Sequence, residues 1–275
     1  MWGISYWIVP LFSGMVWLAM LLGMLLTWVV DGEPHYSSMN DNQHIAYISD
    51  IGAGSLKPMF IAMSAVTVVS FDLVFIFERW LRHSGRLHPN TSWFQKICSI
   101  ICIIAAIAGA AGLILLSIFD TKRHPSLHDA FLVLFIAGYI ISAIAICVEY
   151  QRLGVHHRRT ILHVSFWMKI GFIIIELGLA IAFGVMNQQN RYNMAAILEW
   201  VIALIFTFYV WSFFVDFIPA VRTKRHQSRE TTVEMAEEAG SQDRLYPHHR
   251  NMPMANGYYP PRGATASPAA AAGHF

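Results

Sequence analysis

Six long apolar stretches occupy most of this 275-residue chain. A stretch of about 20 apolar residues, coiled as a helix, matches the hydrocarbon core of a bilayer. Helices are needed there because lipid offers no partner to a free backbone N–H or C=O. Only 13% of the residues are charged, against about 25% in soluble domains. The sequence therefore predicts an all-α, polytopic membrane bundle with six transmembrane helices, at Trp7–Val30, Met59–Phe77, Ile97–Phe119, Ala130–Val148, Val164–Met186 and Ala195–Phe217.

The composition changes after the sixth stretch, which divides the chain into a membrane domain at 1–220 and a tail at 221–275. The tail begins with a basic collar, mixes acids with His, Pro, Gly and Ala, and ends in an Ala-rich run. Such a segment cannot bury enough apolar surface to offset its chain entropy. We expect a disordered tail, on the cytosolic side of the membrane.

Lys and Arg near the span ends indicate the orientation, because they gather on the cytosolic side. One side is predicted to carry ten of them and the other four. The ten-residue side is therefore assigned to the cytosol, together with both termini, and the opposite side is called the outer side. The short outer loop with Lys122 and Arg123 runs against the rule, and a glycan on the Asn90 sequon would invert this topology. The ten residues are Arg79, Arg82, Arg86, Lys96, Arg152, Arg158, Arg159, Arg222, Lys224 and Arg225, and the other four are Lys57, Lys122, Arg123 and Arg191.

Acids and histidines gather where three separate segments reach the outer side. Such groups are costly near the hydrocarbon boundary unless they are paired or functional. Three interpretations stay open: a hydrogen-bonded cluster that ties loops and helix ends together, a site for a lipid headgroup, and a metal site. The metal ligands would come from Asp120, His124, His128 and Asp129, although Pro125 pushes the residue before it out of helical geometry. The whole outer polar cluster is Asp50, Asp120, His124, His128, Asp129 and Glu199.

The start of the fourth span has its own local signals. Ser126 is predicted to cap the helix, with Asp129 three positions later completing a box-like start.

Glu176 lies near the middle of the fifth predicted span, where an isolated carboxylate is costly. Asp72, Tyr139 and Ser142 are candidate partners, whereas Lys169, two turns earlier on the same face, is too far away for direct contact. Glu176 is either a structural group hydrogen-bonded between helices or part of a relay for protons or substrate.

Five glycines within the spans are predicted to form faces at which helices approach closely. They are Gly109, Gly112, Gly171, Gly178 and Gly184.

Three short motifs lie at the outer ends of the predicted spans. The first outer loop contains Tyr47-Ile-Ser-Asp50-Ile-Gly52 before Pro58, and the sixth span opens with Glu199-Trp200. Between them stand Phe119-Asp120, His124 and His128-Asp129-x-Phe131. With this order and placement, residues 1–220 resemble the Frag/DRAM/Sfk family of six-span membrane proteins. The length and the tail are most similar to those of its fungal branch.

The resemblance implies a non-enzymatic protein that organises membrane lipid. Its function would be recruitment of a phosphatidylinositol 4-kinase complex through cytosolic loops and tail, retention of phospholipids in their leaflet, or an autophagy-related role. Partners would be membrane lipids and that kinase complex, with no nucleic acid and no cofactor. We expect the plasma membrane ahead of vacuolar, lysosomal, Golgi or ER membranes. The alternative is an intramembrane lipid-modifying enzyme, through a distant relation to proteins that remodel GPI-anchor lipid, using the outer His and Asp residues; no catalytic residue is assigned.

Removing the tail after Arg225 should weaken recruitment of the kinase complex while the membrane domain still folds. The membrane-bound fraction of the kinase, compared between full-length and truncated chains of equal abundance, measures this. Unchanged recruitment by the truncated chain would remove the tail from the mechanism.

Overall fold

The computed structural model describes residues 6–83, 93–157 and 160–222, without the side chains of residues 152–162 and of those beyond 218. These ranges contain eight helices. They are α1 (Ile8–Val30), α2 (Ile48–Gly52), α3 (Lys57–His83), α4 (Trp93–Ile118), α5 (Pro125–His157), α6 (Thr160–Gln188), α7 (Tyr192–Ser212) and α8 (Phe214–Arg222). The described ranges contain no strand, and the predicted all-α class is confirmed. The sequon at Asn90 and nearly all of the predicted tail lie outside these ranges.

Six helices are long and apolar enough to cross a membrane, namely α1, α3, α4, α5, α6, and α7 continued into α8. The six-span prediction is confirmed, and the chain is an integral membrane protein. Most helices extend a few residues past the predicted spans, because polar residues continue the helix beyond the apolar stretch. Ser126 is not the cap predicted for it. α5 already begins at Pro125, whose fixed φ suits the first turn of a helix.

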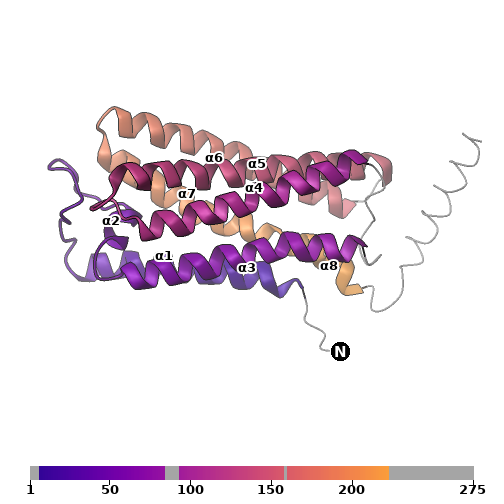
Figure 1. The fold of residues 1–275 in the computed structure, drawn as a ribbon, viewed down its shortest axis with the longest axis horizontal. Helices are drawn as coiled ribbons and strands as arrows, with labels where there is room; N and C mark the ends of the chain where they lie inside the picture. The colour runs from indigo at the N-terminus through magenta and orange to yellow at the C-terminus, as the bar shows by residue number, and fades with distance from the viewer. Residues whose placement is uncertain (1–5, 84–92, 158–159, 223–275) are drawn as a thin grey trace, which may run out of the picture. The chain divides into compact units, whose positions relative to one another are not determined.

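The six spans form a closed ring (Figure 1). Each packs against its neighbours in the chain, from α1 through α3, α4, α5 and α6 to α7, and α7 returns to α1. The α3 start, the α4–α5 turn, the α6–α7 turn and the long loop carrying α2 share one end of the bundle, while α8 lies at the other. We call these the outer and inner ends, after the predicted orientation.

Aromatic rings fill the centre of the ring of helices. Phe71 on α3 lies 5.2 Å from Phe213, 5.6 Å from Tyr139 and 6.0 Å from Phe206, measured between ring centroids. The Phe213 and Phe206 rings meet Phe71 edge-to-face, which adds stability beyond the burial of area alone, and the Tyr139 ring is tilted against it. These contacts join α3, α5 and α7 across the interior.

Glycine brings two helix backbones together between α4 and α5. A Cβ atom on Gly138 would lie 2.5 Å from the Gly109 backbone nitrogen, and one on Gly112 would lie 2.6 Å from that of Phe135. Close approach at small residues is a common way for helices to pack in lipid. The prediction for Gly109 and Gly112 is confirmed.

The same prediction is wrong for the three glycines of α6. A Cβ atom on Gly171, Gly178 or Gly184 would meet nothing within 4 Å among the described residues. The reason is the position of α6 at the edge of the bundle: 6% of its apolar window is buried, against 39–44% for the other spans.

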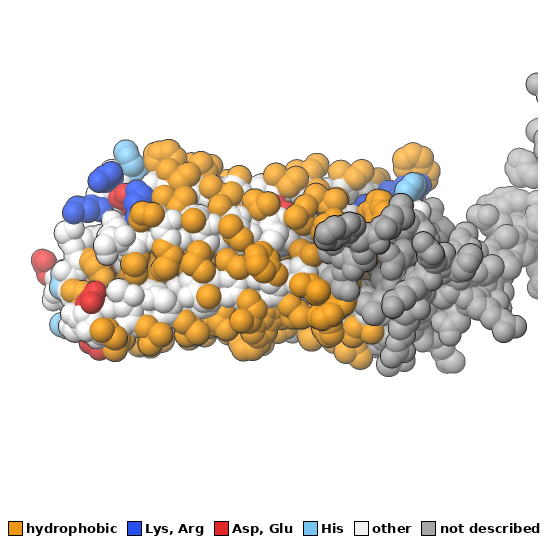
Figure 2. All heavy atoms as spheres, turned by 90° about the horizontal axis from the view of Figure 1, so that it is seen from below, with side chains coloured by type: hydrophobic (Ala, Val, Ile, Leu, Met, Phe, Trp, Pro, Cys, Tyr) orange, Lys and Arg blue, Asp and Glu red, His pale blue; other side chains and the backbone are white. Residues whose placement is uncertain are grey.

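The surface agrees with a membrane-spanning bundle. In the view of Figure 2, hydrophobic side chains cover the length of the helices, and charged side chains gather near the outer end. Ile104, Ile174 and Val133 are among the exposed apolar residues of the spans.

Gly138→Ala should lower the stability of the bundle by at least about 1–3 kcal/mol, because the added methyl group overpacks the α4–α5 contact against rigid backbone. Gly178→Ala is the matched control and should be neutral or slightly stabilising, since alanine favours helix and the site is open. Thermal unfolding of the two purified variants measures the difference. Equal losses would contradict the close α4–α5 contact.

Candidate functional site

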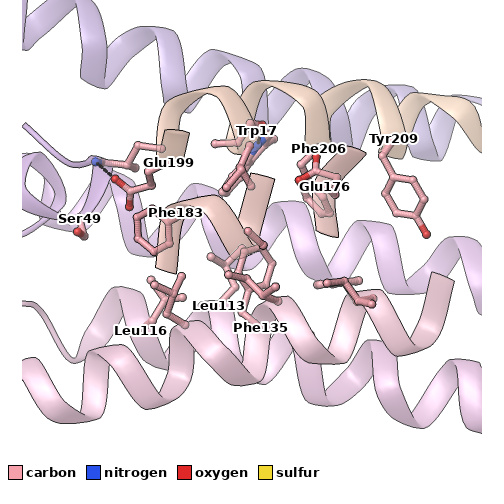
Figure 3. Close-up of a pocket in the computed structure, with 18 of the residues that line it drawn as sticks. Trp17, Ser49, Leu113, Leu116, Phe135, Glu176, Phe183, Glu199, Phe206 and Tyr209 are labelled. Carbon is pink, nitrogen blue, oxygen red and sulfur yellow. Dashed lines mark hydrogen bonds between the residues drawn. The ribbon is translucent and has the colours of Figure 1, made fainter. Parts of the chain in front are cut away.

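A cavity lies inside the ring, between α6 and the helices opposite it (Figure 3). Its volume is about 120 Å³. Most of its wall is aromatic or aliphatic, with side chains from every span and from α2. The aromatic ones are Trp17, Phe60, Phe135, Tyr139, Phe172, Phe183, Phe206 and Tyr209. A predominantly apolar wall with a few polar groups is typical of ligand sites.

Helix α6 is the wall that separates this cavity from the surrounding lipid. It contributes Phe172, Glu176, Ala180 and Phe183 to the lining. α6 is the least buried of the six spans. Near its outer end the Tyr47 hydroxyl lies 3.5 Å from Asn187 Oδ1, and the Tyr47 ring lies 6.3 Å from that of Phe183.

The short helix α2 covers the outer end of the cavity, where Ile48 and Ser49 line it. The carboxyl group of Glu199 on α7 accepts the Ile48 N–H at 2.8 Å and also bonds the Ser49 N–H. The first N–H groups of a helix have no partner within that helix, so Glu199 supplies one. Gly52 allows α2 to lie directly on Phe60, since a Cβ atom there would be 2.6 Å from that ring.

Asp50 stabilises the same cover from the loop side. Its Oδ2 accepts the Tyr47 N–H at 3.0 Å and a Gln43 Nε2–H at 2.9 Å. Burial, followed by the nearby acids Glu199 and Asp50, raises the pKa of the Tyr47 phenol, which keeps its proton at neutral pH.

The first turns of α7 hold the loop before α2. Asn193 Oδ1 accepts the N–H groups of His44 and Ile45 at 2.6 and 3.0 Å. Trp200 Nε1–H donates to the Ala46 carbonyl at 3.0 Å. The Tyr47–Gly52 motif and the Glu199-Trp200 motif, far apart in sequence, therefore form one contact.

Asp120 belongs to a second, separate group. Its Oδ2 is 2.5 Å from Lys57 Nζ, and its Oδ1 accepts the Arg123 N–H at 2.7 Å. Burial alone would raise the pKa of Asp120, but the bonds to Lys57 and Arg123 and their positive charges bring it below the ordinary value. This group joins the start of α3 to the end of α4.

His128 caps the end of α4. Its Nδ1 lies 3.0 Å from the carbonyl oxygens of both Leu116 and Phe119. Carbonyl oxygens only accept, so Nδ1 carries the hydrogen and donates to carbonyls at the C-terminal end of the helix.

The structure does not assemble the metal ligands that the sequence suggested. His124 and Asp129 are exposed, Asp120 is paired with Lys57, and His128 is bonded to carbonyls. In the described ranges, no group of three or more His, Cys, Asp or Glu side chains could hold a metal ion. The six predicted outer residues thus form two groups. Asp50 and Glu199 hold the α2 cover, and the other four lie where α3, α4 and α5 meet at the outer end.

Asp72, Lys169 and Glu176, the residues predicted inside the membrane, form no hydrogen bond with one another within the described ranges. Tyr139 donates to Asp72 at 3.3 Å, whereas Glu176 Oε1 is buried without a hydrogen-bond partner among the described residues. None of the partners suggested for Glu176 reaches it. Its side chain lines the cavity instead.

Lys169 has a partner that the sequence analysis did not assign. Its Nζ lies 2.7 Å from Asp216 Oδ2 and 2.6 Å from Ser165 Oγ, and its side chain is fully buried. This pair links α6 to α8 on the inner side of the cavity. No local pattern could have indicated it, because Asp216 stands near the end of an apolar span, where water would ordinarily reach it.

A buried ion pair on α3 was also missed. Arg82 lies 2.7 Å from Glu78, and the Tyr150 hydroxyl donates to the same Glu78 oxygen at 2.6 Å. The spacing of Glu78 and Arg82 by four residues is the signal that could have found the pair. Lys169 Nζ lies 5.3 Å from the centre of the Tyr150 ring. We therefore group five residues as the inner charge network: Glu78, Arg82, Tyr150, Lys169 and Asp216.

Residues 5–220 match the sequence model of the Frag1/DRAM/Sfk1/Cwh43P N-terminal domain. The chain is similar to "Protein sfk1" of Schizosaccharomyces pombe, with 31% identity over 224 residues, 80% of this chain and 66% of that protein. It is also similar to "Protein SFK1" of Saccharomyces cerevisiae, with 28% identity over 178 residues, 54% of this chain and 50% of that protein. The matches thus span less than two thirds of either relative's own length, and no solved structure matches the chain.

The Lys57–Asp120 pair should make stability depend on acid pH. Because the folded state lowers the pKa of Asp120 below 3.8, the pair stabilises fully above that value and is lost as the pH falls through the lowered pKa. Asp120→Asn should therefore melt at a lower temperature than wild type at about pH 6 and lose less stability on acidification. The difference in the free energy of unfolding should be about 1 kcal/mol or less, because solvent screens the pair. Asp41→Asn, at an exposed acid, is the control. Equal losses of stability by wild type and Asp120→Asn between about pH 6 and 2 would contradict the assignment.

Proposed function

We propose, from the premise that this chain belongs to the Frag1/DRAM/Sfk1/Cwh43P N-terminal domain family, that it binds a membrane lipid in the cavity behind α6. By holding that lipid it would organise lipid within its membrane without catalysing a reaction. The observation that carries the proposal is the apolar cavity itself, placed within the membrane-spanning ring and separated from the bilayer by one loosely packed helix.

The lining favours hydrocarbon over water. Phe135, Phe172 and Phe206 face the cavity, and few of the side chains in its wall are polar. A water needs two to four polar partners to be held in such a place. Hydrocarbon from a neighbouring lipid needs no polar partner, so it can occupy the same space favourably.

The two ends of α6 differ in a way that suits lipid exchange. The Lys169–Asp216 pair fixes the inner half, while the outer half, with Ala180 and Phe183, has the cavity behind it. Outward movement of this half would open the cavity to the outer leaflet while the inner half stays attached.

Recruitment of a phosphatidylinositol 4-kinase complex at the plasma membrane remains part of the proposal. It would use the loops and the tail that the charge distribution assigns to the cytosol. Retention of phospholipids in their leaflet is the second consequence that a bound lipid could support.

The alternative of a lipid-modifying enzyme is not carried further. It was based on Asp120, His124, His128 and Asp129 acting together. Asp120 is engaged with Lys57 and His128 with the end of α4, so neither arrangement supports that chemistry.

Filling the cavity should displace the lipid. Ala180→Phe places a ring inside the lining, and we expect the purified variant to lose most of the lipid that wild type retains. Ala137→Phe, the same substitution at an exposed position of α5, is the matched control and should retain it. Lipid molecules per protein, counted by quantitative mass spectrometry after purification in detergent, give the readout. Equal lipid content in Ala180→Phe and wild type, with both folded, would rule out the cavity as the site.

A further inference from the structure

Two polar groups inside the cavity have no hydrogen-bond partner among the described residues: Glu176 Oε1 and the Tyr209 hydroxyl. Both side chains line the cavity, one from α6 and one from α7. Figure 3 shows Ser49 and Glu199 at one end, Tyr209 at the other, and Glu176 between them. Tyr209 is 5% exposed, so water does not replace the missing partner.

Unpartnered buried polar groups are rare, and each one calls for an explanation such as a ligand. The polar groups at the outer end of the cavity are already satisfied, since Glu199 bonds the α2 backbone and His128 bonds the end of α4. The unused hydrogen-bonding capacity is therefore confined to the part of the cavity near Glu176 and Tyr209.

Charge limits what can bind there. The lining contains two carboxyl groups, Glu176 and Glu199, and no Lys or Arg among the described residues. Phosphate groups are ordinarily held by Arg, Lys or backbone N–H groups, and a like charge next to a carboxylate is costly. A phosphate is therefore disfavoured inside the cavity.

Hydrogen-bond chemistry selects the rest. A carboxyl oxygen accepts a hydrogen bond whether the group is ionised or neutral, and a phenol both donates and accepts. A lipid hydroxyl can therefore donate to Glu176 Oε1.

We infer, resting on the proposed function, that the lipid in this cavity is an uncharged one with a free hydroxyl, bonded by Glu176, and with no phosphate inside the cavity. Diacylglycerols, ceramides and sterols share this chemistry. The aromatic wall around Phe135 and Phe206 packs against the hydrocarbon part, and Glu176 selects the hydroxyl.

The test uses the full-length protein in phosphatidylcholine nanodiscs and four photoactivatable probes: a diacylglycerol, a ceramide, a sterol, and a phosphatidylcholine with the acyl chains of the diacylglycerol. Cross-linked peptides are mapped by mass spectrometry. We expect at least one hydroxyl probe to label cavity peptides of α5, α6 or α7 about five- to tenfold more than the phosphatidylcholine probe. The probe that labels most strongly identifies the source of the hydroxyl.

The variants separate recognition of the hydroxyl from occupancy of the cavity. Glu176→Leu should reduce labelling by the hydroxyl probe about five- to tenfold, whereas Glu176→Gln, which keeps an acceptor oxygen, should retain most of it. Glu176→Leu removes an unpartnered polar atom, so it should fold and melt no lower than wild type.

Thermal unfolding gives an independent readout. Added diacylglycerol, ceramide or sterol, whichever labels the cavity, should raise the melting temperature of wild type by preferential binding to the folded state. The rise should be much smaller for Glu176→Leu.

The outcomes distinguish the two proposals. Equal labelling of the cavity by the phosphatidylcholine and hydroxyl probes, or labelling unaffected by Glu176→Leu, would overturn the hydroxyl inference while lipid binding in the cavity stands. Absence of all four probes from the cavity peptides would overturn both.

Discussion

The Lys169–Asp216 ion pair is the interaction on which the position of α6 depends. Lys169 is fully buried, and a charge inside a membrane bundle is tolerated only with a partner. Asp216 and Ser165 supply that partner, with Phe213 4.3 Å from the ammonium group. A helix with little buried surface of its own is thus held at its inner end by an ion pair. Towards its outer end the cavity lies behind it.

The outer end of the bundle is stabilised by a different kind of contact. There the partners are backbone N–H groups of α2 and of the loop before it, and the acceptors are the side chains of Glu199, Asp50 and Asn193. Each of these bonds satisfies a group that would otherwise be costly to bury. Polar residues at this end therefore close the site, and the groups left unsatisfied, Glu176 and Tyr209, lie deeper within it.

The six spans were predictable from the sequence because each is encoded by its own run of apolar residues. The motif residues Tyr47–Gly52 and Glu199-Trp200 were also singled out, but their contact depends on α7 closing the ring, which no local pattern contains. The same limit applies to Lys169 and Asp216, which are 47 residues apart. The prediction of close packing at the glycines of α6 was wrong for a related reason. A small residue permits another helix to approach, but it does not determine whether a helix lies there.

The closing contact of the ring has a consequence for how the protein is made. Trp17 on α1 donates its indole N–H to the Ala203 carbonyl of α7 at 2.8 Å, across 186 residues of sequence. Chains emerge from the ribosome N-terminal end first, so α1 enters the membrane long before this acceptor exists. The cavity is completed only when α7 arrives, by which time its other walls have stood open to the bilayer during synthesis. A lipid that occupies it can be enclosed at assembly, as part of the newly made protein.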